Sequence, residues 1–335
     1  MKSIYLAGSP STLGGADTEA LNNIYLWRRY GVDVHIVPMG GIDSKMALEM
    51  QSIGCTIHEY EPSIFKDKIV VSYCNGNFLA ALPKIMEEGK PALVVWANCM
   101  TYVFSDEIIA HKNKWIDIFV FVSNYQENML RPQLEVHNPV KSLVGYKPYF
   151  NLDKVSFTYR EPQEWHSFGR VSRDDGSKFP TDLWETFYKI CVPKRKKIFV
   201  LGFGPNAVKK TGPAPSTLDW QTWLPNEIPV KSFYQILHCI VHKTGGSRES
   251  YCRICPEAYA YGVPFICEDD FAFPELVIDG VTGYRCKSSD EMSYRASELA
   301  FDEIKRKNMI IAARKYLEND IAAPEQCWSA WKQLF

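Results

Sequence analysis

The sequence predicts an α/β protein with two domains, each built around a parallel sheet. Three observations predict this fold class. The chain has 335 residues, which is long enough for two domains of ordinary size. Short apolar runs alternate with amphipathic stretches, as expected for repeated β-α-β units. Hydrophobic residues make up 46% and aromatic residues 13% of the chain, values typical of packed globular proteins.

The first domain is predicted to open with a β-α-β unit. Residues 4–7 and 32–37 are apolar enough for strands, and residues 18–29 have apolar side chains at helical spacing. The loop before this helix contains Gly14 and Gly15 but has no clean G-x-G-x-x-G sequence, so a dinucleotide fingerprint is weak. A plain flexible turn is the alternative for this glycine pair.

The same alternation continues through the first half of the chain. The segment starting at Ser123 predicts a capped helix, with Gln126 completing a capping box. The predicted strands are residues 55–58, 68–73, 92–96 and 116–122, and the predicted helices are residues 47–52 and 78–88.

Asn98 follows the nearly all-apolar strand at residues 92–96. Open α/β sheets bind ligands at the carboxyl ends of their strands, which makes Asn98 a candidate binding residue. Its side-chain amide can both donate and accept hydrogen bonds. A turn-forming asparagine is the alternative interpretation.

A linker is expected near residues 150–160, followed by a second domain with the same alternation. Prolines and tryptophans make residues 206–226 irregular, so an insertion or long loop is expected there. Further strands are predicted at residues 198–201, 236–241 and 263–267, and helices at residues 182–190, 289–300, 304–317 and 324–335.

Residues 245–264 are the most informative stretch of the chain. Glu249 and Glu257 lie eight positions apart, between two apolar runs, so we expect Glu249 in a polar loop and Glu257 on a helix. We expect backbone amides to open this helix, where N–H groups attract phosphate or sugar oxygens. The alternative is a pair of solvated carboxylates at a helix end. The residues expected to supply the amides are Ser250, Tyr251 and Cys252.

This stretch resembles the Glu-x7-Glu signature of retaining glycosyltransferases with the GT-B fold, of the family-four (group 1) type. Glu249 and Glu257 match the two glutamates, residues 262–264 match a Gly-x-Pro segment, and Cys252 replaces the usual glycine. The resemblance implies two Rossmann-like domains facing each other across a cleft. It also implies that Glu249 orients the donor sugar and that Glu257 holds the ribose of the nucleotide.

A second match to the same family begins at residue 169. Members of the family carry a Gly-Arg pair at the end of a strand and a lysine several residues later. The arginine and the lysine bind the donor diphosphate. The resemblance assigns these roles to Arg170 and Lys178, with Arg173 as a third contact. The spacing to Lys178 is longer than in many members, and a surface ion pair is the alternative for Arg170. Fixed cations in a dry cleft stabilise a departing diphosphate.

The resemblance also covers the first domain. It places Gly14 and Gly15 against the donor phosphates and sugar, since only glycine lets the backbone approach so closely. Asn98 stands near the place of a histidine that contacts the donor sugar in many members. Further donor contacts are assigned to Ser250, Tyr251 and Cys252.

The predicted division is an acceptor domain (residues 1–152), a nucleotide-sugar domain (153–316) and a helix that returns to the first domain (317–335). The implied reaction is transfer of a hexose-type sugar, with retention, from a nucleotide-diphosphate sugar to an unknown acceptor hydroxyl. The donor is expected to be UDP-linked. No metal or other cofactor is expected, because cations and a helix dipole can neutralise the diphosphate.

Charge and cysteine usage bear on partners and location. The net charge of -1 gives no general attraction to nucleic acid or anionic membranes. No apolar stretch approaches the roughly 20 residues of a membrane span, and the N-terminus is too short in its apolar part for a secretory signal. Ten scattered cysteines are consistent with a cytoplasmic protein with reduced thiols. Cys252 and Cys255 form a CxxC without a second ligand pair.

Three other functions remain open on the sequence alone. A transferase acting on modified DNA bases is possible, although the near-neutral charge does not favour it. A nucleotide-binding module without catalysis is a second alternative, and the intact Glu249, Glu257 and Arg170 argue against it. A Rossmann oxidoreductase would bind NAD, but the chain lacks the G-x-G-x-x-G loop.

Overall fold

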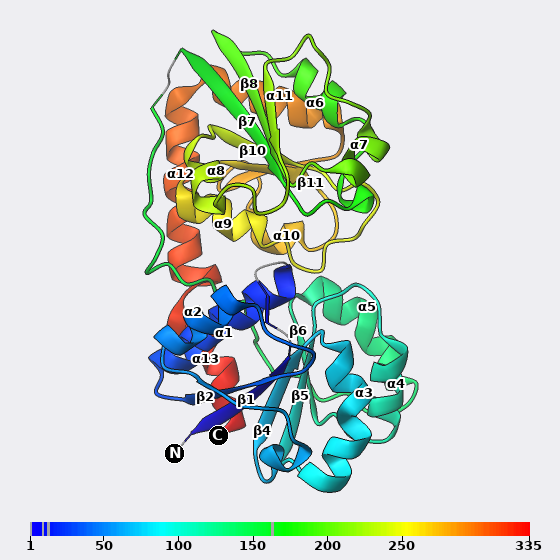
Figure 1. Ribbon diagram of the computed structural model, residues 1–335. Coiled ribbons are helices and arrows are strands. Elements are labelled where there is room, and N and C mark those ends of the chain that lie inside the picture. Colours follow the sequence, from blue (N-terminus) through cyan, green and yellow to red (C-terminus); the bar gives the residue numbers. More distant parts are fainter. Residues whose placement is uncertain (1, 9, 12–13, 162–163) are drawn as a thin grey trace. The chain divides into compact units, whose positions relative to one another are not determined.

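The computed structural model describes residues 2–8, 10–11, 14–161 and 164–335. The chain forms two compact units, one made of residues 1–151 with 321–335 and the other of residues 152–320. Within the described ranges, each unit contains one six-stranded sheet with helices packed on it (Figure 1). The predicted α/β fold with two Rossmann-like domains is confirmed.

The sheet of the first unit has the strand order β3-β2-β1-β4-β5-β6, and every neighbouring pair is parallel. This order reverses direction between β1 and β4, as in doubly wound dinucleotide-binding folds. The strands are β1 (Ser3–Gly8), β2 (Asp33–Pro38), β3 (Thr56–Ile57), β4 (Ile69–Tyr73), β5 (Leu93–Asn98) and β6 (Ile118–Phe121).

Helices cover both faces of this sheet (Figure 1). One apolar core contains Ile24, Met50 and Trp331, and the other contains Phe78 and Leu130. Burial on both faces explains why these strands are nearly continuous apolar runs. The helices are α1 (Gly15–Arg29), α2 (Ser44–Ser52), α3 (Gly76–Lys84), α4 (Ser105–Lys112), α5 (Asn124–Glu135) and α13 (Pro324–Trp331), with short helical turns at Pro62–Phe65, Ile85–Gly89 and Lys332–Leu334.

The second unit repeats the same topology. Its strand order is β12-β11-β10-β7-β8-β9, and all neighbouring pairs are parallel. The order reverses between β7 and β10, and such a switch point is where open α/β sheets bind ligands. The strands are β7 (Trp165–Val171), β8 (Arg195–Leu201), β9 (Trp220–Trp223), β10 (Cys239–His242), β11 (Phe265–Glu268) and β12 (Gly283–Cys286).

One face of the second sheet buries a core that includes Phe168, Phe187, Ile198 and Met292. The helices are α6 (Leu183–Lys189), α7 (Pro205–Thr211), α8 (Val230–Gln235), α9 (Ile254–Tyr261), α10 (Phe273–Leu276), α11 (Ser289–Phe301) and α12 (Glu303–Tyr316), with short helical turns at Gly176–Lys178 and Leu317–Ile321.

Two sequence expectations about local structure are wrong. Residues 206–226 do not form one long loop, because they contain most of α7 and the edge strand β9. Proline at the first position of α7 suits a helix start, and the tryptophans that made the segment look irregular lie in the strand. The capping box at α5 is only half formed. Ser123 accepts from the backbone N–H of Gln126 at 3.0 Å, but the Gln126 side chain bonds elsewhere.

Among the residues that the structure describes, no helix combines the length and the apolar composition needed to cross a lipid bilayer.

Candidate functional site

Lys178 and Glu249 form an ion pair at the switch point of the second unit. Lys178 ends the short helical turn that follows β7, and Glu249 lies in the loop that follows β10. Because β7 and β10 are hydrogen-bonded neighbours, their carboxyl ends bring the two side chains together. The Lys178 Nζ donates to Glu249 Oε1 at 2.7 Å, and the side chains are 19% and 13% exposed.

Glycine is required where the Glu249 loop crosses the segment carrying Lys178. The backbone N–H groups of Gly245 and Ser247 both donate to the carbonyl oxygen of Ser177, each at 3.0 Å. A Cβ atom at Gly245 would lie 2.0 Å from the carbonyl oxygen of Phe179, a distance that real side chains do not reach. This close backbone approach joins the two segments of the candidate site.

Arg170 lies on β7 and is fully buried. Its guanidinium stacks over the ring of Phe179 at 5.4 Å. One terminal nitrogen donates to His242 Nδ1 at 2.6 Å, and the other donates to the carbonyl oxygen of Lys178. Burial lowers the pKa of Arg170 to about 10, so the side chain is still a cation at neutral pH. Arg170 therefore supplies positive charge and also holds the main chain at Lys178.

Glu257 lies on α9, one turn after the helix begins. Its Oε2 accepts a hydrogen bond of 2.9 Å from the hydroxyl of Tyr234, whose ring stacks on Tyr261 with centroids 5.1 Å apart. Burial raises the pKa of the Glu257 carboxyl, and the nearby Arg253 opposes that shift. Two stacked tyrosine rings thus lie beside this glutamate.

The start of α9 differs from the expectation. The helix begins at Ile254, so Ser250, Tyr251 and Cys252 lie in the preceding loop. The backbone of Cys252 still takes part in the turn, because its carbonyl accepts from the N–H of Cys255 at 3.1 Å. Ser250 and Cys252 are buried, and Tyr251 is half-buried.

Arg173 is not brought to the Lys178–Glu249 pair by any contact that the structure shows. Its side chain is 61% exposed and bonds to Asp175 at 3.3 Å. Asp175 also caps the short turn before Lys178 by accepting from the N–H of Ser177 at 2.9 Å. The third cationic contact to the donor stays a prediction.

Gly14 and Gly15 belong to the first unit, at the beginning of α1. Gly14 occupies the N-cap position with φ 115°, a conformation that favours glycine. Its carbonyl accepts from the backbone N–H of Thr18 at 3.2 Å. The turn is therefore specified by glycine, while a contact to the donor stays a prediction.

Asn98 ends β5, and its side chain is fully buried. Its Nδ2 donates to the carbonyl of Tyr102 at 3.0 Å and to Glu107 Oε2 at 2.8 Å. Its Oδ1 accepts from the N–H of Met100 at 2.7 Å. These contacts hold the loop after β5, as expected of a turn-forming asparagine. The predicted contact to a donor sugar has no further support in the described residues.

Gln126 and His242 make polar contacts that the sequence reasoning did not predict. The Gln126 amide donates to the carbonyls of Asn98 and Met100, at 2.5 and 2.6 Å, and so fixes the same loop. His242 is the last residue of β10 and bonds to Arg170. A polar residue directly after an apolar strand was a visible signal for His242. Nothing local distinguishes Gln126 from a helix cap.

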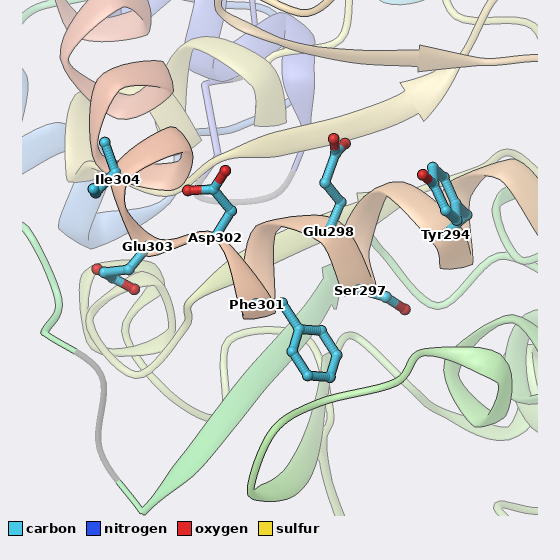
Figure 2. A pocket seen from close by; sticks show the side chains of 7 residues that line it. All are labelled: Tyr294, Ser297, Glu298, Phe301, Asp302, Glu303 and Ile304. Carbon is cyan, nitrogen blue, oxygen red and sulfur yellow. The ribbon is translucent and has the colours of Figure 1, made fainter.

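A separate cavity of about 670 Å³ lies where α11 meets α12 (Figure 2). None of the predicted site residues lines it. The lining residues are Tyr294, Ser297, Glu298, Phe301, Asp302, Glu303 and Ile304.

The topology of the two units and the group at the second switch point define a class of protein. Two doubly wound sheets of identical order, with buried Arg170 and partly buried Lys178 at the carboxyl edge of the second, define a two-domain Rossmann-like protein with a positively charged switch point. Comparison with known proteins gives the more particular assignment.

Residues 218–316 match the family described as glycosyl transferases group 1. No curated protein matches the chain. This match, over part of the second unit, and the GT-B fold of the solved structures below agree with the resemblance noted at residues 245–264.

Several solved structures share the fold over their whole length. HepE from Anabaena, in complex with UDP and glucose, has a TM-score of 0.72 at 12% identity, covering 100% of this chain and 99% of that one. A glycosyltransferase from Rickettsia africae has a TM-score of 0.71 at 13% identity, covering 99% and 97%. TarM has a TM-score of 0.76 at 11% identity, covering 100% and 98%.

Proposed function

We propose that this chain transfers a hexose from a UDP-linked sugar to an acceptor hydroxyl, with retention of configuration and without a metal ion. The observation that carries the proposal is the Lys178–Glu249 pair at the second switch point, with the buried Arg170 bonded to the main chain of Lys178. HepE, a structure of the same fold, is described in complex with UDP-glucose, which supports a UDP-linked donor.

The charges at this group suit a leaving diphosphate. An ammonium has three N–H donors, so Lys178 can keep its bond to Glu249 and still bind a phosphate oxygen. Arg170 adds a second positive charge, and its burial strengthens electrostatic interactions because the protein interior screens charge less than water does. Together the two cations would stabilise the negative charge that gathers on the diphosphate as the sugar leaves.

The carboxylates have separate roles in this proposal. Glu249 would accept hydrogen bonds from hydroxyls of the donor sugar, oriented by Lys178. Glu257 would hold the ribose, oriented by the Tyr234 hydroxyl. Sequence reasoning did not assign Tyr234 this orienting role.

The proposed reaction is a front-face substitution. The bond between the anomeric carbon and the phosphate oxygen breaks while the acceptor oxygen bonds to the same face of that carbon. The acceptor proton passes to the departing phosphate oxygen, so the products are the glycoside and UDP. No protein nucleophile is needed, and retention is supported by the resemblance of Glu249 and Glu257 to the family signature.

Calorimetric titration with UDP, GDP, ADP and NAD tests the donor class. We expect UDP to bind, and Lys178→Ala to weaken its binding by about tenfold, or 1.4 kcal/mol, because one cation is lost. Lys189→Ala is the matched control, since Lys189 pairs with the exposed acids Glu185 and Asp290, each at 2.7 Å. Binding of NAD but of no nucleoside diphosphate would disprove the proposal.

Hydrolysis of UDP-α-glucose, with water as acceptor, tests the stereochemistry. We expect proton NMR to show α-glucose before mutarotation mixes the anomers. Appearance of β-glucose first would rule out retention. Full activity after exhaustive treatment with EDTA is expected from the proposed use of cations in place of a metal.

A further inference from the structure

His242 has no part in the reaction proposed above, yet its side chain is fixed at the centre of the site. It ends β10, and only 1% of it is exposed. The imidazole packs against the rings of Phe265 and Phe273, with both centroid distances 5.7 Å. An apolar residue would fill such a position more simply, so the polar contacts of the ring need an explanation.

The contacts of His242 specify one tautomer. Nδ1 lies 2.6 Å from a guanidinium nitrogen of Arg170, and a guanidinium can only donate. Nδ1 therefore carries the lone pair, and the hydrogen of the neutral ring is on Nε2. Nε2 lies 3.8 Å from Cys252 Sγ, a weak acceptor. Burial and the charges of Arg170 and Lys178 hold the pKa of His242 well below its usual value, consistent with the neutral ring.

These contacts close a ring through the site. From His242 the path runs to Arg170, whose other terminal nitrogen donates to the carbonyl of Lys178. Lys178 Nζ then bonds to Glu249 at 2.7 Å. Glu249 is followed three residues later by Cys252, which contacts His242 again. Each residue in this closed path is thus connected to two others in the path.

We propose that His242, anchored by Cys252, is a positioning residue that fixes Arg170 and, through it, the Lys178–Glu249 pair for binding a nucleoside diphosphate. This inference rests on the proposed function. Cys252 occupies the position of a glycine in the family signature, and glycine has no side chain to contact an imidazole. In this proposal, Cys252 holds the imidazole of His242, and His242 in turn holds the guanidinium of Arg170.

Two substitutions at position 242 separate positioning from packing. His242→Asn keeps an acceptor oxygen close to the place of Nδ1, so Arg170 retains a partner. His242→Leu fills the space beside the phenylalanine rings without any acceptor. Cys252→Ser and Cys252→Ala form a second pair, because serine can accept from Nε2–H and alanine cannot.

His238→Leu is the matched control. His238 is buried directly before the same strand, and its Nδ1 lies 2.7 Å from the hydroxyl of Ser167, outside the ring of contacts. Burial lowers its pKa to about 3, so it is neutral, as His242 is. His238→Leu therefore shows the effect of removing a buried neutral histidine for which the described part of the structure shows no contact with Arg170 or Cys252.

The test compares UDP with UMP by calorimetric titration of the full chain. We expect His242→Leu to weaken UDP binding about tenfold and UMP binding by less than about threefold. The reason is that the contacts from His242 through Arg170 to Lys178 position the cations that bind the diphosphate. His242→Asn and Cys252→Ser should stay within about threefold of the wild type for both ligands. His238→Leu should not change the ratio of the two affinities.

The outcomes are distinguishable. A wild type that does not bind UDP overturns the proposed function, and this inference with it. If Lys178→Ala weakens UDP binding and His242→Leu does not, only this inference is overturned. Equal loss in the leucine and asparagine variants, or equal loss for UDP and UMP, shows a purely structural histidine. Should thermal melting show that His242→Leu is unfolded, the Cys252→Ala and Cys252→Ser pair decides by the same UDP-to-UMP ratio.

Discussion

At the scale of single residues, Glu107 places a carboxyl in the interior of the first unit. The side chain is fully buried, and its Oε2 accepts from Asn98 Nδ2 at 2.8 Å and from the N–H of Phe104 at 3.1 Å. Burial raises its pKa from 4.5 to about 7, and the hydrogen bonds only partly oppose this shift. The carboxyl helps to hold the loop after β5 but adds a titrating group near neutral pH.

Glu107→Gln is expected to remove a pH dependence of stability. Between pH 4.5 and about 7 the folded state binds more protons than the unfolded state, so stability falls as the pH rises through this window. The shift corresponds to at most about 3 kcal/mol above pH 7. Urea unfolding at pH 5 and pH 8 should show the variant gaining stability over the wild type only at pH 8.

The exposed Glu87→Gln is the control for the Glu107 prediction, and it should leave the pH dependence as it is. A wild-type stability that rises between pH 5 and pH 8, by an amount that Glu107→Gln does not change, would contradict this account of Glu107.

At the scale of elements, α13 is attached to the first unit through Trp331. The indole is fully buried, meets Trp27 edge-on at 4.8 Å, and donates from Nε1 to Asn23 Oδ1 at 2.9 Å. Trp328 stacks on Tyr30 at 4.8 Å in the same interface. The C-terminal segment is therefore part of the core of this unit.

Trp331→Ala is expected to destabilise the first unit by roughly 3–5 kcal/mol, because it leaves a large cavity and an unpaired Asn23 oxygen. Trp331→Phe should cost less, since it keeps most of the packing. Phe335→Ala, at a residue that is 42% exposed, is the control on the same segment. Denaturant unfolding measures all three, and equal losses for Trp331→Ala and Phe335→Ala would refute the anchoring role.

At the scale of the whole molecule, the two units have the same strand order, but the chain is divided between them in different ways. The second unit is one continuous segment, residues 152–320, whereas the first takes its last helix from residues 321–335. Each has its own hydrophobic cores. Units with separate cores can unfold separately, and a single free energy of unfolding then loses its meaning.

Scanning calorimetry is expected to resolve two unfolding transitions. UDP at about 100 times its dissociation constant should add roughly 2.7 kcal/mol to one transition, because the proposed site lies in the second unit. Trp331→Ala should lower the other transition and leave the UDP-sensitive one in place. One cooperative transition that responds to both changes would show that the units unfold together.

Much of the fold was predictable because burial on both faces of a parallel sheet leaves long apolar runs. The strands at β1, β5 and β10 are visible in this way. The edge strand β9 was missed, since its residues are half-buried or exposed and its tryptophans resemble those of a loop. Gln126 was misassigned in part because its side chain reaches residues 26 and 28 positions away.

The sequence by itself determined the fold class, because alternating apolar and amphipathic stretches follow from local periodicity. Its resemblance to group 1 glycosyltransferases named the candidates Arg170, Lys178 and Glu249. Only the tertiary structure decided how they meet. It places His242 against Arg170, 72 residues away, and Lys178 against Glu249, 71 residues away. The physical reason is that neighbouring parallel strands join residues distant in sequence, and no local pattern records which side chains then touch.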